Sequence, residues 1–278
     1  MSVFEALILG IVQGNTEFLP VSSSGHLVLL QRIFGITEPA MAFNAAVHGG
    51  TLIAVVLVLW RDIWSLLTRI VQPLTLYLII GTLPTVAAAL LFRDVIEKAF
   101  ATGAFLGFAF LITTTLLIVS DRLYRGSGKP GGLPARMDNP APPRLQSEMT
   151  WVDALLIGLL QAVAIAPGIS RSGATISAAL SRRLDRDFAA RFSFLLSIPA
   201  ILGALVLHLR EFSDVGAGEG IGLLPIMVGS ISAGIVGFFS VRFTIKMVRE
   251  RSLIGFAVYT GILGTLVLID QFGTNFVF

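Results

Sequence analysis

The chain has 278 residues, of which 55% are hydrophobic and only 13% are charged, and its formal net charge is +3. A soluble domain usually carries about 25% charged residues, so this composition favours a membrane protein over a soluble one. The lack of cysteine excludes disulfides and thiolate metal sites, and the basic residues stand between apolar runs, which fits loops beside anionic lipid and predicts no nucleic-acid partner.

The first element is an apolar stretch at about 3–12 that is too short to cross a bilayer, which takes about 20 apolar residues. It runs into the polar segment 13–26 and then into a second short apolar piece at 25–34. Irregular backbone is tolerated at membrane depth only where protein or a water-filled cavity surrounds it. The pattern therefore predicts a re-entrant helix–loop–helix that turns back inside the membrane.

Later stretches of the chain are long and apolar enough to be transmembrane helices. These six stretches are residues 42–60, 74–92, 100–119, 189–209, 222–241 and 253–269. A second broken segment stands between the third and the fourth, where the short apolar stretch 152–166 leads into polar residues and then into 174–180. The predicted fold is an all-α integral membrane protein with six transmembrane helices and two re-entrant helix–loop–helix segments.

The distribution of Lys and Arg predicts the orientation of these helices. Most of the 20 Lys and Arg residues fall in four segments, 61–73, 120–150, 181–191 and 242–253. The positive-inside rule places such segments in the cytoplasm, so both termini are expected to face outward. The expected location is the plasma (inner) membrane, which the chain crosses several times.

The two broken segments match one another at a shift of 148 residues. Gly10, Gln13, Ser22, Ser24 and Gly25 fall on Gly158, Gln161, Ser170, Ser172 and Gly173. In the orientation predicted from Lys and Arg, the first broken segment enters the membrane from outside and the second enters from inside. The two halves are therefore predicted to be an inverted-topology repeat, and their breaks are expected to meet within the membrane. The prediction is a single membrane domain, 1–278, with repeat 1 at about 1–119, a cytoplasmic linker at about 120–150 and repeat 2 at about 151–278.

Three charged or titratable side chains fall inside the breaks, and they are Glu17, His26 and Arg171. A charge at bilayer depth costs about 2.5–3.5 kcal/mol, so such residues usually pair or serve function. Arg171 offers a planar guanidinium that fits phosphate oxygens. Glu17 and His26 offer acid/base chemistry, and Ser23 or His26 offers a nucleophile. The alternatives are a structural ion pair between Glu17 and Arg171 and a structural role for His26.

Hydroxyl-rich turns and helix N-termini surround these groups. A short helix follows each break, and its free N–H groups and positive dipole end suit an anion. One cation, many donors and an acid/base pair predict phosphoryl transfer, in which positioning and charge stabilisation supply most of the catalysis. The predicted substrate-binding residues are Gln13, Ser22, Ser24, Ser170, Ser172, Gly173 and Thr175.

The motifs TEFLPVSSSGH at 16–26 and PGISRSGATIS at 167–177 resemble the two signature motifs of the bacitracin-resistance type undecaprenyl-diphosphate phosphatases. The stretches 48–56 and 192–204 also resemble that family, so the similarity covers nearly the whole chain. The resemblance implies a membrane hydrolase that removes one phosphate from undecaprenyl diphosphate and so recycles the lipid carrier for cell-wall synthesis. It also implies bacitracin resistance, a polyprenyl diphosphate lipid as partner, a site open to the outer face and a divalent cation, Mg²⁺ or Ca²⁺.

Carried over by position, the family's essential glutamate falls on Glu17, its candidate nucleophile serine on Ser23, its histidine on His26 and its arginine on Arg171. The first acidic residue of the family's motif is Gln13 here, which shifts any metal onto Glu17 and the phosphates of the lipid. The nucleophile is either Ser23, with Glu17 or His26 as base, or His26 itself through a phosphohistidine. A homodimer is compatible with these expectations.

The rival function is a secondary transporter or flippase for an anionic lipid or a small anion. Inverted repeats with broken helices at the membrane midplane are also transporter architecture, and an Arg beside helix N-termini can hold an anionic cargo. The combination of Glu17, Ser23 and His26 separates the two hypotheses, because transport alone does not need these three groups. The sequence therefore favours the phosphatase.

Overall fold

The computed structural model describes residues 1–36, 40–125, 142–215 and 221–278. Across these residues the chain is helical and has no strand. The helices of the first half are α1 (Val3–Thr16), α2 (Ser23–Ile33), α3 (Met41–Val58), α4 (Trp60–Thr68), α5 (Pro73–Leu91), α6 (Arg93–Thr102) and α7 (Leu106–Arg125). Those of the second half are α8 (Trp151–Val163), α9 (Arg171–Ser181), α10 (Arg186–Val215), α11 (Leu223–Glu250) and α12 (Ile254–Ile269).

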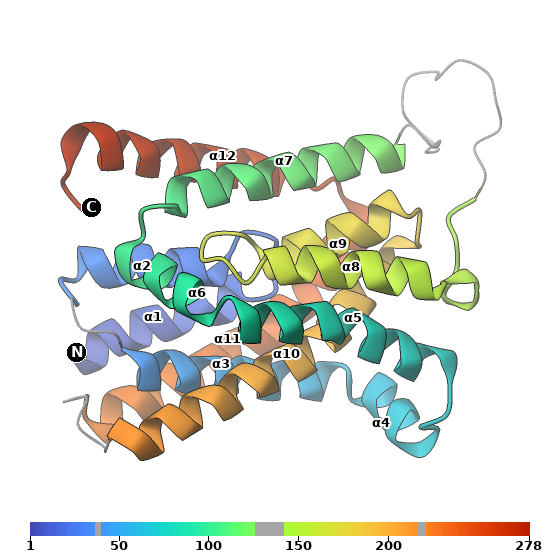
Figure 1. Ribbon diagram of the computed structural model, residues 1–278, viewed down its shortest axis with the longest axis horizontal. Helices are drawn as coiled ribbons and strands as arrows, with labels where there is room; N and C mark the ends of the chain where they lie inside the picture. The colour runs from blue at the N-terminus through green and yellow to red at the C-terminus, as the bar shows by residue number, and fades with distance from the viewer. Residues whose placement is uncertain (37–39, 126–141, 216–220) are drawn as a thin grey trace.

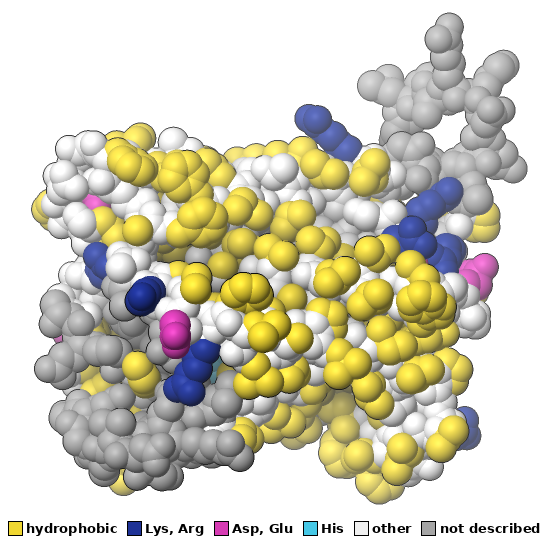
Figure 2. All heavy atoms as spheres, viewed as in Figure 1, with side chains coloured by type: hydrophobic (Ala, Val, Ile, Leu, Met, Phe, Trp, Pro, Cys, Tyr) yellow, Lys and Arg dark blue, Asp and Glu magenta, His cyan; other side chains and the backbone are white. Residues whose placement is uncertain are grey.

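Six of these helices are long and apolar enough to cross a membrane, which confirms the number predicted from the sequence. They are α3, α5, α7, α10, α11 and α12. Their apolar side chains face outward over much of their length, and Figure 2 shows hydrophobic side chains across the middle of the molecule, with Lys and Arg toward its two ends. This is the surface of a multi-pass membrane protein.

The third predicted span, 100–119, has the wrong start. Helix α6 ends at Thr102, because Gly103 adopts the left-handed conformation at φ 61° and caps it, and α7 begins at Leu106. Helix α7 also continues to Arg125, so the first residues of the predicted linker 120–150 are helical. Residues 126–141 of that linker lie outside the described residues.

Four short helices, α1, α2, α8 and α9, carry the two broken segments. Figure 1 shows α1 and α2 toward the end of the bundle that holds both termini, and α8 and α9 toward the opposite end. The turns between the members of each pair lie between these two sets of helices. Ser22 and Ser170 cap the second helix of each pair with the side-chain oxygen, so the same local signal restarts the helix in both breaks.

The halves of the chain are interlocked through close helix packing. Helix α1 packs against α11 of the second half, and α8 packs against α5 of the first half. Glycine permits both approaches: a Cβ on Gly10 would lie 2.3 Å from the carbonyl oxygen of Gly229, and a Cβ on Gly158 would lie 2.4 Å from that of Gly81. The first helix of each broken segment therefore packs closely against a spanning helix from the other half of the chain.

Candidate active site

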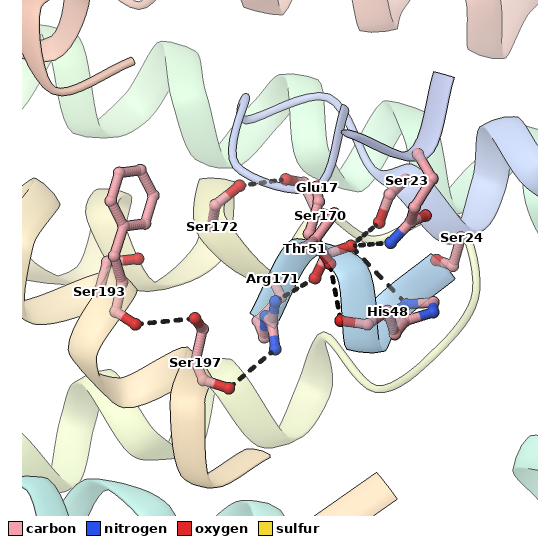
Figure 3. Close-up of polar contacts among 12 residues, drawn as sticks. Glu17, Ser23, Ser24, His48, Thr51, Ser170, Arg171, Ser172, Ser193 and Ser197 are labelled. Carbon is pink, nitrogen blue, oxygen red and sulfur yellow. Dashed lines mark hydrogen bonds and ion pairs between the residues drawn. The ribbon is translucent and has the colours of Figure 1, made fainter. Parts of the chain in front are cut away.

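Glu17 directly follows α1 and is the centre of a polar cluster where the two broken segments meet (Figure 3). Its side chain is 4% exposed. Its Oε2 accepts hydrogen bonds from Gln13 Nε2 at 2.9 Å and from Ser23 Oγ at 2.5 Å. Its Oε1 accepts a hydrogen bond from the guanidinium of Arg171, which also neutralises the charge. A buried carboxylate is tolerated here because each oxygen has a donor.

Ser23 is brought to Glu17 by an unusual turn. Its neighbour Ser22 adopts φ 71° and ψ 95°, a conformation rare for a residue with a side chain, and its Oγ accepts the N–H of Gly25 at 3.3 Å. Ser23 is therefore the first residue of α2, and its hydroxyl points back to the end of α1. A hydroxyl that donates to a buried carboxylate is the arrangement of an activated nucleophile.

Arg171 occupies the corresponding place in the second break, as the first residue of α9. Ser170 caps that helix by accepting the N–H of Gly173 at 3.0 Å. The guanidinium reaches across to Glu17 and donates to the carbonyl of Ser197 on α10 at 3.5 Å. Its side chain is 20% exposed, so part of the fork stays open to an anion.

Direct bonds between the breaks fix this geometry. Ser172 Oγ donates to the carbonyl of Leu19 at 2.9 Å, and the N–H of Gly168 donates to Ser24 Oγ at 3.4 Å. The two turns are therefore joined by backbone and side-chain contacts as well as by the ion pair.

A pocket opens over the cluster, and its cavity volume is about 160 Å³. Sites that bury a drug-sized ligand measure about 300–1,000 Å³, so this pocket has room for a phosphate headgroup and not for a whole polyprenyl lipid. Its polar lining is Glu17, Ser22, Ser23, Ser24, His48, Ser170 and Arg171. Its apolar wall includes Ile169, Ala200, Ile201 and Ala204.

His48 is a pocket residue that was not predicted as part of the site. It lies on α3, where its Nε2 is 3.7 Å from Glu17 Oε2 and its Nδ1 is 2.7 Å from the carbonyl of Asn44. The sequence did contain a signal, since a titratable residue inside the predicted span 42–60 is costly unless it pairs or serves function. What the sequence could not give is the packing of α3 against the end of α1.

Four predicted substrate-binding residues are in the structure but do not line the pocket. Gln13 binds Glu17, and Ser172 binds the carbonyl of Leu19. Thr175 Oγ1 donates to the carbonyl of Arg171 at 2.9 Å and lies 2.5 Å from Ser193 Oγ. Gly173 packs tightly on the capping Ser170, where a Cβ would approach within 3.0 Å. These residues hold the site in place, whereas Ser22, Ser24 and Ser170 do reach the pocket.

His26 lies apart from the cluster. Its ring is buried between α2, α7 and α12, where Nδ1 is 2.6 Å from the carbonyl of Ser22 and Nε2 is 2.6 Å from Tyr259 Oη. It is absent from the lining of the pocket. Of the four predicted catalytic residues, the structure thus brings together Glu17, Ser23 and Arg171.

These features define a multi-pass membrane protein with a Ser–Glu–Arg pocket suited to an anionic headgroup. The sequence matches the family described as Bacitracin resistance protein BacA over residues 6–266, and the chain belongs to that family.

Several relatives match the chain over nearly its whole length. The undecaprenyl-diphosphatase of Carboxydothermus hydrogenoformans is 43% identical over 277 residues, which cover 99% of this chain and 100% of that protein. Undecaprenyl-diphosphatase 4 of Bacillus thuringiensis subsp. konkukian is 42% identical over 274 residues, 98% of each chain. The undecaprenyl-diphosphatase of Methanosphaera stadtmanae is 36% identical over 291 residues, 97% of this chain and 98% of that protein.

Proposed function

We propose that this protein is an undecaprenyl-diphosphate phosphatase, which hydrolyses undecaprenyl diphosphate to undecaprenyl phosphate and inorganic phosphate. The activity recycles the lipid carrier for cell-wall synthesis and gives bacitracin resistance. One observation carries the proposal: Ser23 and Arg171, from separate broken segments, both bind the buried carboxylate of Glu17 at the edge of a headgroup-sized pocket. Relatives named for this substrate, matched over almost the full chain, support it.

Ser23 is the nucleophile in this proposal. Its Oγ attacks the terminal phosphorus, its proton passes to Glu17 Oε2, and the bond from that phosphorus to the bridging oxygen breaks to release undecaprenyl phosphate. Glu17 returns the proton to the leaving phosphate. Water then attacks the phosphoserine, Glu17 takes a proton from the water, and Ser23 Oγ leaves and regains a proton as inorganic phosphate departs.

Arg171 and the starts of two helices stabilise the charge that develops on phosphorus. The guanidinium moves from Glu17 to the phosphate oxygens when the substrate binds, which frees Glu17 Oε1 and makes that carboxylate a better base. Helices α2 and α9 begin at the pocket, so the positive ends of their dipoles face the negatively charged phosphate and stabilise it. His48 stands beside Glu17 and faces the same headgroup.

A divalent cation, Mg²⁺ or Ca²⁺, fits this site only together with the substrate. Among the residues that the structure describes, no three His, Cys, Asp or Glu side chains are grouped to hold a metal ion. Glu17 is available as a ligand, and Gln13 Oε1 is a buried oxygen without a hydrogen-bond partner in the described part of the chain. Both side chains offer oxygen ligands of the kind these cations prefer, and the diphosphate would supply the remaining oxygen ligands. When bound, the cation would neutralise charge on the diphosphate.

The membrane arrangement that we propose is an inverted-topology repeat with two re-entrant segments. Support comes from the exchanged packing of α1 on α11 and of α8 on α5, and from the serine caps at equivalent positions of the breaks. We place the protein in the plasma (inner) membrane with the pocket opening to the outer face, on the side of both termini. Transport of an anion is not favoured, because it gives no reason for Ser23 to donate to Glu17.

The test is release of inorganic phosphate from prenyl diphosphates by the purified protein in detergent. Farnesyl and undecaprenyl diphosphate are each supplied with Mg²⁺, with Ca²⁺ and with a chelator. We expect phosphate release that depends on the cation and is lost in Ser23→Ala. A folded wild-type protein that releases no phosphate from either lipid would sink the proposal.

A further inference from the structure

We propose that Tyr259 on α12 is a positioning residue for catalysis, which acts through His26 to hold the turn that presents Ser23. The inference rests on the proposed function with Ser23 as nucleophile. It assigns His26 a role other than attack on phosphorus, and it gives α12, which contributes nothing to the lining of the pocket, a part in the reaction.

Hydrogen-bond chemistry fixes the tautomer of His26. A backbone carbonyl can only accept, so the 2.6 Å contact between Nδ1 and the carbonyl of Ser22 places the proton on Nδ1. Nε2 is then the acceptor, and the hydroxyl of Tyr259 donates to it at 2.6 Å. Both ring nitrogens are engaged within the protein, which leaves neither free to attack phosphorus.

Aromatic packing holds the imidazole in this orientation. The ring of Phe110 on α7 meets it edge to face, with centroids 5.6 Å apart. The ring of Tyr259 lies nearly parallel to it, at an interplanar angle of 7° and a centroid distance of 5.7 Å. His26 itself is only 7% exposed. The histidine is therefore a rigid link from α12 to the first break.

The link ends on Ser22, a residue with an unusual backbone conformation. Ser22 adopts a φ of 71°, which side-chain-bearing residues rarely adopt and keep only where the surroundings enforce it. Its carbonyl receives both the backbone N–H of His26, at 3.3 Å, and the Nδ1–H of the ring, at 2.6 Å. The next residue is Ser23, whose hydroxyl meets Glu17 at 2.5 Å. A relaxed Ser22 would rotate that hydroxyl away from its base.

Amide replacements of His26 separate positioning from chemistry. Asparagine places an amide N–H near the position of Nδ1, so His26→Asn keeps a donor for the Ser22 carbonyl but loses the contact with Tyr259. His26→Ala loses both. If the imidazole acts only by positioning, His26→Asn retains more activity than His26→Ala.

The experiment measures kcat and KM for undecaprenyl diphosphate, with Tyr77→Phe, a change at a half-buried tyrosine of α5, as the matched control. Tyr259→Phe is expected to lower kcat about tenfold with KM nearly unchanged, the scale of one positioning hydrogen bond. Adding Tyr259→Phe to His26→Asn is expected to change nothing further, because the link is already broken.

Several results would overturn the inference while leaving the phosphatase proposal intact. They are a normal kcat in Tyr259→Phe, a change confined to KM, a lower melting temperature with a normal kcat, or additive losses in the double variant. Acid-labile phosphate on His26 would overturn it as well. A wild-type protein without activity on any prenyl diphosphate would overturn the proposed function, and this inference with it.

Discussion

Glu17 and Arg171 depend on each other, because each is a charge that the apolar surroundings would otherwise penalise. Replacement of either is expected to reduce turnover by at least about 10²-fold, the scale of losing a preorganised charge or a base. The measurement compares Glu17→Gln and Arg171→Ala with Arg69→Ala, a change at an exposed arginine. Near-normal phosphate release in either variant, with Arg69→Ala also normal, would remove that residue from the mechanism.

The two candidate nucleophiles, Ser23 and His26, would give chemically different intermediates. Attack by Ser23 gives an acid-stable phosphoserine, whereas attack by His26 gives an acid-labile phosphohistidine. We expect Ser23→Ala to abolish phosphate release and any trapped phosphate on the wild-type protein to survive acid. A stable Ser23→Ala variant with wild-type turnover would exclude the serine route.

His48 extends the site beyond the two broken segments. Its Nε2 lies 3.7 Å from the carboxylate of Glu17 and it lines the pocket, so His48→Ala removes a polar group that faces the headgroup. We expect turnover to fall about tenfold, the scale of one hydrogen bond from the imidazole to the phosphate headgroup. Unaltered kcat and KM in a folded His48→Ala variant would restrict the site to the two broken segments.

At this scale the sequence identified the residues that stand out chemically. Glu17 and Arg171 were predictable because charges are rare in apolar segments, and Ser23 was distinguished from its neighbouring serines by the resemblance of its motif to that of the bacitracin-resistance phosphatases. The sequence could not show that Thr175 bonds to Ser193 or that His26 bonds to Tyr259, because those partners lie on other helices, α10 and α12, whose packing the sequence does not give.

At the scale of the helices, the N-terminal end of α8 is stabilised by a cluster of charged side chains around Asp153, which lies outside the six spanning helices. Asp153 is fully buried and accepts hydrogen bonds from Arg144, Arg182 and Thr150. Burial alone would raise the pKa of the Asp153 carboxyl, but the hydrogen bonds from the two arginines and Thr150 outweigh it and hold that pKa well below its usual range. The cluster also caps the helix, since Thr150 and Asp153 bond to each other's backbone N–H.

Asp153→Asn is therefore expected to lower the free energy of unfolding by about 2 kcal/mol, the value of hydrogen bonds to a charged group. A carboxyl whose pKa is lowered by folding stabilises the protein fully above its unfolded pKa of about 3.8, and that stabilisation is lost as the pH falls toward the folded pKa. The difference in melting temperature between variant and wild type should thus stay constant from about pH 8 to 5 and shrink only below about pH 4.

The control for this prediction is Asp94→Asn, a change at an exposed aspartate of α6. It should leave the melting temperature nearly unchanged. A difference for Asp153→Asn that already disappears between pH 8 and 5 would contradict the lowered pKa.

The existence of the spanning helices was predictable because they are long and apolar, but the residues at which the helices end were harder to predict. The break between α6 and α7 was missed because the stretch 99–111 around Gly103 is mostly apolar, and the left-handed cap is visible only in the backbone. Helices α1 and α8 are short, as predicted, but their ends were not predictable: α1 continues through the polar residues to Thr16, and α8 ends at Val163 although apolar residues follow it.

At the scale of the whole molecule, α1 packs on a helix of the second half and α8 on a helix of the first half. The orientation of the two halves in the membrane is therefore the property to test. The proposed topology puts the C-terminal end outside and the start of α8 in the cytoplasm. Because the chain has no cysteine, single cysteines report directly on sidedness. Thr274→Cys should react with an impermeant maleimide on intact cells, whereas Ser147→Cys should react only after permeabilisation; both positions are exposed.

Labelling of both cysteines from the same side would contradict the proposed topology of the second half. At this largest scale the sequence predicted the membrane class and the six spans, because hydropathy decides them. The mutual packing of the halves could not be predicted, because it depends on close glycine contacts such as those of Gly10 and Gly158.

The most direct test of the central claim is phosphate release from undecaprenyl diphosphate by the purified wild-type protein, with Glu17→Gln beside it. The account predicts steady release of one inorganic phosphate per lipid, with undecaprenyl phosphate as the second product, and a loss of at least about 10²-fold in Glu17→Gln. A folded wild-type protein that leaves the lipid intact, or equal turnover by the two proteins, would contradict it.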